Sequence, residues 1–413
     1  MMIKSESVKI IPSAAPVYSL GFCALHTPIL SSVTIRGLAG LSAHSVSLSV
    51  YGLSKSGFFS EKCVFSGGEL FFRETEGDLH FDLQNADFRL KKDFFRNLKA
   101  PVTGKICVEA LIDGVRFSGD APITLLPART YPVGAASAYF AVCLTPFHPE
   151  ISRIVENVPS RDLEALYASL KREAIIYSVK DCDFLRKNTP FDDIRTLYTG
   201  RARMASPLEM AQLFCCAALR VGFSPIVAAF RGGKAPRLFC GVADGGVFNR
   251  AVGLSHARLL SALGTRRAAV FDVSCLFTGH SVELSDACHK AEEELQDLNP
   301  AFIVDIGRVL AGGADFFGLY PEDAPHEKAF LEALRKAPAS KKNTLSSLAE
   351  SLTHTDKTPL LSYSFEEHGG IFVHFSDFSL LPSLAAKEVE YALAGTADLA
   401  DLQKIAPYPD GIS

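Results

Sequence analysis

Cysteine, histidine and aspartate residues between positions 237 and 280 could together support thiol chemistry. A cysteine becomes a nucleophile when a neighbouring histidine takes its proton and an acid orients that histidine. The candidates are Cys240 and Cys275 as nucleophiles, His256 and His280 as bases, and Asp244 and Asp272 as orienting acids. The simpler interpretation of Cys240 is a packed residue of a strand. A catalytic pair would therefore have to be assembled by the fold.

The element that could present a nucleophile is a helix predicted to begin at Pro207. Ser206 is a favourable N-cap, proline suits the first helical position, and Glu209 completes a capping box. The helical run ends at Gly222, a common stop signal. The elements expected next are strands at Pro225–Phe230, Leu238–Ala243 and Ala268–Val273, with a Gly232-Gly233 turn after the first, and a helix at Val282–Leu298.

Composition excludes several classes of function. The chain has 413 residues, 48% of them hydrophobic, and a net charge of −4, so it can build real cores but offers no broad basic surface for direct nucleic-acid binding. No continuous apolar segment indicates a signal peptide or a membrane span, which predicts a cytoplasmic protein. The ten cysteines form no CxxC pair and the histidines do not cluster with them, so we expect reduced core cysteines, no metal and no cofactor.

Residues 1–129 have the pattern of a β-sandwich. Val46, Leu48 and Val50 alternate with serines, a period of two that suits a strand with one buried face. Asp113-Gly114 between two apolar runs is a hairpin signal, because glycine tolerates a positive φ. The predicted strands are Ser45–Tyr51, Glu69–Arg73, Leu79–Leu83, Gly104–Ile112 and Val115–Phe117.

A mixed pattern follows, and the fold class expected for the whole chain is α+β. Residues 130–321 read as an α/β domain, in which Arg161–Glu173 has the apolar stripe of an amphipathic helix. Residues 322–413 read as a small mixed region. Its predicted elements are helices at His326–Lys336, Thr344–Leu352 and Ser383–Leu393, a strand at Gly370–Phe375, and a linker at Ala337–Asn343.

Several short blocks in the α/β region share their order with those of a known family. They are Thr145-Pro-Phe-His-Pro149, Ala174–Ser178, Arg195–Pro207, Val270-Phe-Asp-Val-Ser274, Leu284–Leu295 and Asp305–Pro321. In this order they resemble the transglutaminase-like, papain-like domain at the N-terminal end of large bacterial proteins that continue into a superfamily 1 helicase and a nuclease-like region. The chain has no GxxxxGK[ST] phosphate loop, so the helicase part of those proteins is missing here.

The chain departs from this family at the catalytic positions. Where the family has Cys-Leu-Asp-Leu-Ala, this sequence has Pro207-Leu-Glu-Met-Ala211. The family's His-Ala-Phe-Val-Gly strand corresponds to Arg237-Leu-Phe-Cys-Gly241, and its acidic position corresponds to Asp272. Proline offers no nucleophile, and arginine stays protonated near neutral pH. The resemblance therefore implies a site that has lost acyl transfer.

Arg237 has two further interpretations. With Arg231 and Lys234 it could bind a carboxylate or phosphate, because a guanidinium presents two parallel donors. The alternative is an exposed arginine at a strand end, or one paired with Asp244.

The function expected from the sequence is that of a non-catalytic binding or scaffold protein. The resemblance implies that its partner is an ATPase, a helicase or a nuclease. In one version of this hypothesis, the chain is the accessory subunit of a two-gene system, and a separate protein supplies the helicase. The alternative is a thiol hydrolase or acyltransferase with a relocated pair, Cys240 or Cys275 with His256 or His280.

Overall fold

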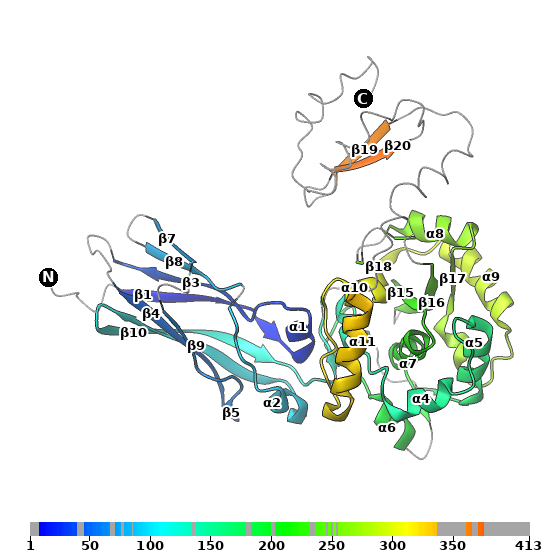
Figure 1. Ribbon diagram of the computed structural model, residues 1–413, viewed down its shortest axis with the longest axis horizontal. Coiled ribbons are helices and arrows are strands. Elements are labelled where there is room, and N and C mark those ends of the chain that lie inside the picture. The colour runs from blue at the N-terminus through cyan, green and yellow to red at the C-terminus, as the bar shows by residue number, and fades with distance from the viewer. Residues whose placement is uncertain are drawn as a thin grey trace. The chain divides into compact units, whose positions relative to one another are not determined.

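A computed structural model places fifteen described ranges of the chain (Figure 1). These are residues 8–38, 45–66, 71–75, 78–84, 86–133, 135, 137–178, 183–199, 203–231, 236–244, 247–248, 251–252, 255–336, 361–365 and 371–375. The chain divides into two compact units, Met1–Lys336 and Ala337–Ser413. Helices and mostly antiparallel strands occur together, so the fold class is α+β as predicted.

Two sheets make up the N-terminal part of the first unit. One has the strand order β1-β3-β8-β7, and the other has the order β2-β10-β9-β4-β5, with β6 also paired to β4. Their bounds are β1 Lys9–Ala14, β2 Val17–Tyr18, β3 Leu30–Arg36, β4 Val46–Ser54, β5 Gly57–Phe58, β6 Cys63–Ser66, β7 Phe71–Thr75, β8 Asp78–Asp82, β9 Val102–Ile112 and β10 Val115–Leu125. The five predicted strands are confirmed as β4, β7, β8, β9 and β10. Strands β1 and β3 were not predicted.

Sequence alternation decides which side chains of these sheets face the core. Leu48 and Val50 of β4 are fully buried, whereas Ser47 and Ser49 are partly exposed, as the period of two predicts. Asp113 and Gly114 join β9 to β10 with φ values of 46° and 85°, so the predicted hairpin turn is confirmed. Strands β1 and β10 also contact each other, which brings the two sheets together around shared buried residues.

The second part of this unit is built on an antiparallel sheet with the order β17-β16-β15-β18. Its strands are β15 Ser224–Phe230, β16 Arg237–Ala243, β17 Ala268–Asp272 and β18 Pro300–Asp305, and the three strands that were predicted here are confirmed. Helix α7, Pro207–Arg220, is also confirmed, and it packs on β15 and β16. Figure 1 shows α7 end-on beside this sheet.

Most apolar residues of β16 and β17 alternate between two hydrophobic clusters, one on each face of the sheet. In β16, Leu238 and Cys240 join the cluster that contains α7, whereas Phe239 joins the cluster that contains α8 and α9. In β17, Phe271 lies on the α7 face and Val270 on the opposite face. The sheet is therefore covered on both faces.

The remaining elements surround α7 and connect the two parts. They are α1 Leu20–Ala24, α2 Lys92–Asn97, β11 Thr130–Tyr131, α3 Tyr139–Val142, α4 Pro149–Val155, α5 Leu163–Arg172, β12 Ile176–Tyr177, β13 Thr189–Pro190, α6 Ile194–Thr199, β14 Met204–Ala205, α8 His256–Gly264, η1 Val273–Leu276, α9 Leu284–Leu295, α10 Ile306–Ala311, η2 Pro321–Asp323 and α11 Ala324–Lys336. The helices predicted over α5, α9 and α11 are confirmed, whereas α8, α10 and β18 were not predicted.

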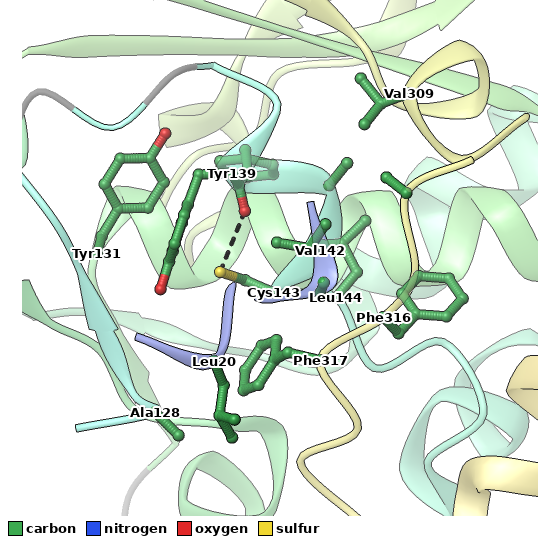
Figure 2. Packing of buried hydrophobic residues seen from close by; sticks show 14 of the residues in the cluster. Leu20, Ala128, Tyr131, Tyr139, Val142, Cys143, Leu144, Val309, Phe316 and Phe317 are labelled. Carbon is green, nitrogen blue, oxygen red and sulfur yellow. Dashed lines mark hydrogen bonds between the residues drawn. The ribbon is translucent and has the colours of Figure 1, made fainter. Parts of the chain in front are cut away.

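Segments far apart in the sequence share one buried cluster around α3. Figure 2 shows Leu20 beside Phe317 and Tyr131 beside Tyr139, and these residues belong with Ala128 to one cluster. The thiol of Cys143 donates a hydrogen bond to the carbonyl of Tyr139 at 3.2 Å. The predicted β-rich region, the α/β region and the segment after α10 thus contribute to a common core.

In the second unit, β19 (Leu361–Phe365) and β20 (Ile371–Phe375) form an antiparallel pair, and β20 confirms the strand predicted at Gly370–Phe375. The predicted Thr344–Leu352 and Ser383–Leu393 helices, the Ala337–Asn343 linker and the Gly232-Gly233 turn lie outside the described residues. Helix α11 contacts α10 and belongs to the first unit, although it follows the predicted boundary at residue 321. The boundaries at residues 129 and 321 stay predictions.

Replacing Gly241 by alanine should destabilise the first unit. A Cβ at this position would lie 1.9 Å from the carbonyl oxygen of Ala269 and 2.7 Å from the Cα of Val270, both backbone atoms of β17. The sheet would have to shift, so we expect the free energy of unfolding to fall by about 1–3 kcal/mol. Gly264→Ala, at a helical position with nothing within 4 Å, is the matched control. It should stabilise by up to about 1 kcal/mol. Urea unfolding followed by circular dichroism measures both, and equal effects would contradict the packing argument.

Candidate functional site

The N-terminus of α7 is closed by its own capping residues. The hydroxyl of Ser206 accepts from the Glu209 amide at 3.4 Å, and the Glu209 carboxylate accepts from the Ser206 amide at 2.6 Å. The other oxygen of Glu209 accepts from the amide of Asp192 at 2.5 Å. Glu209 is 5% exposed, so a buried carboxylate lies at the helix end where a thiolate would need positive potential. The predicted capping box is confirmed, and Pro207 is the first helical residue.

Arg237 and Asp272, two positions predicted from the resemblance, meet in the structure. A guanidinium nitrogen of Arg237 lies 2.6 Å from a carboxylate oxygen of Asp272 and 2.5 Å from an oxygen of Glu294 in α9. The guanidinium also lies over the ring of Phe239, 5.1 Å from its centroid. The other oxygen of Asp272 caps η1 by accepting from the amide of Ser274 at 2.8 Å.

The charge state of Arg237 follows from these contacts. Burial disfavours the charged guanidinium, but the hydrogen bonds to Asp272 and Glu294 outweigh it, so the pKa of Arg237 is raised above its usual value. A residue that stays cationic cannot accept the proton of a thiol. The arrangement can hold two carboxylates together, and it cannot serve as a general base.

Arg237 points away from α7. Strand alternation puts it on the same face as Phe239, and its contact with Glu294 in α9 agrees. Arg237 and Asp272 therefore lie on the α8 and α9 side of the sheet, whereas Pro207 starts the helix that packs on the other side. The structure therefore brings Arg237 and Asp272 together and separates both from Pro207.

The predicted pairing of Arg237 with Asp244 is wrong, because Asp272 and Glu294 are its partners. The predicted anion site has no support either, since these two carboxylates already occupy the guanidinium. Arg231 is exposed and donates its backbone N–H to the carbonyl of Asn299. Lys234 lies outside the described residues.

The pair Cys240 and His256 is separated by the sheet. Cys240 is fully buried on the α7 face, where Cys215 of α7 is its neighbour. His256 begins α8 on the other face, with its ring centroid 5.5 Å from that of Phe230. Its Nε2 is buried and has no hydrogen-bond partner among the described residues. Thiol and imidazole therefore cannot exchange a proton across the sheet.

The second fallback pair also lacks the features of an active thiol. Cys275 lies in η1 and is 8% exposed, while His280 lies on the surface. Burial, followed by the charge of Asp272, raises the pKa of the Cys275 thiol. On α7, Cys215 and Cys216 are both buried, and burial raises the pKa of Cys216 to about 12. Raised pKa values keep these thiols protonated and unreactive.

Sequence reasoning did not single out a buried cluster of ionisable residues beneath η2 and α11. The ring of His148 lies 4.9 Å from the ring of Tyr320, and His148, Asp323 and Glu327 are each less than 8% exposed. His148 lies in the Thr145–Pro149 block that resembles the known family, so the sequence drew attention to the block but not to this histidine as part of a buried cluster. Its partners lie about 175 positions further along the chain, and only the fold brings them to it.

No protein-family model matches this chain, and a search of curated protein sequences finds no significant match. Within the ranges that the structure describes, no helix is both long and apolar enough to cross a membrane. The nine described cysteines are free thiols.

Replacing Arg237 by methionine should remove the guanidinium that joins Asp272 and Glu294 and leave the 3.9 Å contact between Lys290 and Glu294 in place. Removing one partner of a fully buried pair costs about 3–5 kcal/mol. The Arg237 side chain is 38% exposed and screened by water, so we expect a loss of about 1–2 kcal/mol in the free energy of unfolding. Arg231→Met is the matched control at an exposed position and should change stability by less than about 0.5 kcal/mol. The loss for Arg237 should be larger at low salt than at 1 M NaCl. A loss that salt leaves unchanged would argue against ion pairing as its cause.

Proposed function

We propose that this chain is a non-catalytic binding or scaffold protein built on a degenerate transglutaminase-like domain. In this proposal, the domain spans residues 130–321 and follows a β-sandwich over residues 1–129. The observation that carries it is the pairing of Arg237 with Asp272 and Glu294, because it puts a fixed cation where the resemblance requires a base.

The state of the described thiols supports the same proposal. Seven of them, Cys23, Cys107, Cys143, Cys215, Cys216, Cys275 and Cys288, have pKa values raised by burial. A thiol enzyme needs the opposite, a thiolate favoured by a nearby cation or a helix N-terminus. At the start of α7, Glu209 puts a negative charge in that place.

The partner in this proposal is a protein, with an ATPase, helicase or nuclease as the candidate class, and the location is the cytoplasm. This part rests on the resemblance and on a net charge of −4, which disfavours direct binding to a phosphate backbone. The other candidate function, a thiol hydrolase or acyltransferase with a relocated pair, draws no support from Cys240 and His256, which lie on opposite faces of one sheet.

Limiting iodoacetamide labelling of the folded protein at pH 7, followed by peptide mapping, tests this proposal. Among the described cysteines, the half-buried Cys23, Cys63 and Cys288 should react first. None of the ten cysteines of the sequence should react faster than a free thiol. Labelling in denaturant, where all ten should react, is the control for peptide coverage. One cysteine that reacts ten or more times faster than a free thiol would overturn the proposal, and its mutation together with the nearest histidine would then identify the pair.

A further inference from the structure

Two acidic side chains lie on the buried face at the start of the last helix of the first unit. Asp323 ends η2, and Glu327 lies one helical turn further on, in α11. Each is only 6% exposed. An oxygen of Asp323 is buried and has no hydrogen-bond partner among the described residues. Buried acids of this kind are costly when both are charged, so their protonation must affect how well this segment packs.

The groups around Glu327 only partly balance its charge. Lys92 and Arg96 of α2 favour the ionised form, whereas Asp323 opposes it. The charge of Glu327 in turn adds to the effect of burial in raising the pKa of the Cys216 thiol in α7. Around Asp323, the charged or titratable neighbours are His148, His326, Arg195 and Glu322. Arg96 already donates to the carbonyl of Gly318, and Arg195 to the carboxylate of Glu322.

The other described contacts of α11 are mainly apolar or made by arginine, apart from His326, whose ring stacks on that of Phe147 with centroids 6.2 Å apart. Leu331 is buried, and the ring of Phe330 packs against Phe147 and Phe316, with centroids 5.5 and 6.3 Å away. Arg335 donates to the carbonyls of Leu310, Gly313 and Ala314 near the end of α10. These contacts hold the C-terminal half of the helix, while the acidic pair lies under its start.

We propose that protonation of the Glu327 and Asp323 pair controls how tightly α11 packs on the rest of the first unit. When Glu327 holds a proton, this acidic pair carries at most one buried negative charge. When both acids are ionised, repulsion and the loss of hydration favour an opened α11 that exposes them to water.

The direction of the pH effect follows from the pKa values. Burial, reinforced by the charge of Asp323, raises the pKa of Glu327 from 4.5 to about 7, and burial also raises the pKa of Asp323. The packed helix therefore holds a proton that the opened helix releases, so packing weakens as pH rises from about 4.5 to about 7 and then levels off. Burial lowers the pKa of His148, which acts in the opposite direction and only below its ordinary value of 6.5. Measurements above pH 6.5 keep the contribution of His148 small.

Hydrogen exchange of the full chain, read by mass spectrometry, tests this proposal. The quantity compared is the protection factor of α11 amides, corrected for intrinsic exchange and referred to α7 in the same sample. For the wild-type protein, we expect α11 protection to fall about fourfold from pH 6.5 to pH 8, as a two-state titration with a pKa near 7 requires. Glu327→Gln should abolish this fall and raise α11 protection at pH 8 by about tenfold or more, because each pKa unit corresponds to a factor of ten.

Glu332→Gln is the matched control, since it makes the same charge change at an exposed position of the same helix. It should keep the wild-type pH dependence. The proposal is overturned if the Glu327 variant keeps that dependence too, or if wild-type α11 protection relative to α7 stays constant or rises between pH 6.5 and pH 8. The wild-type titration decides the matter even if the Glu327 variant does not fold.

Discussion

Burial of α7 on all sides is the constraint on which the rest of the first unit depends. Twelve of its fourteen residues are buried, because the β15 and β16 strands cover one side and α4 and α5 cover the other. A helix enclosed in this way cannot hydrate its terminal N–H groups, so they must be satisfied internally. Ser206 and Glu209 do this at the N-terminus. The same carboxylate makes this helix end unfavourable for a thiolate.

The second organising interaction lies across the sheet from α7. Arg237 joins the start of β16 to the end of β17 and to α9, so a single guanidinium ties together three elements. An arginine in this position supplies attraction where a histidine would supply proton exchange. The Asp272 carboxylate keeps a local role as well, because it caps η1. The geometry thus favours a structural role for this group of residues.

The connection between the β-rich part and the α/β part is built from both apolar and polar contacts. Leu20, Tyr139 and Phe317 share one cluster, and Arg96 of α2 donates to the carbonyl of Gly318. Residues after α10 therefore pack against both parts. The acidic pair under α11 lies close to this connection, since Lys92 and Arg96 of α2 are among its charged neighbours. A change in the packing of α11 would therefore alter the environment of Lys92 and Arg96, where the β-rich part contacts the α/β part.

The sequence by itself determined the elements whose signals are local. The capping box at Ser206, the alternation in β4 and the positive φ of Asp113-Gly114 each depend on residues within a few positions, and local chemistry is enough to predict them. Only the tertiary structure decided which face each side chain occupies and which distant residues it meets. That is why Glu294 was missed as a partner of Arg237, why Cys240 and His256 proved to lie on opposite faces, and why His148 was not linked to Asp323. Ion pairs and buried charges depend on distances between residues far apart in the chain, and no local pattern encodes those distances.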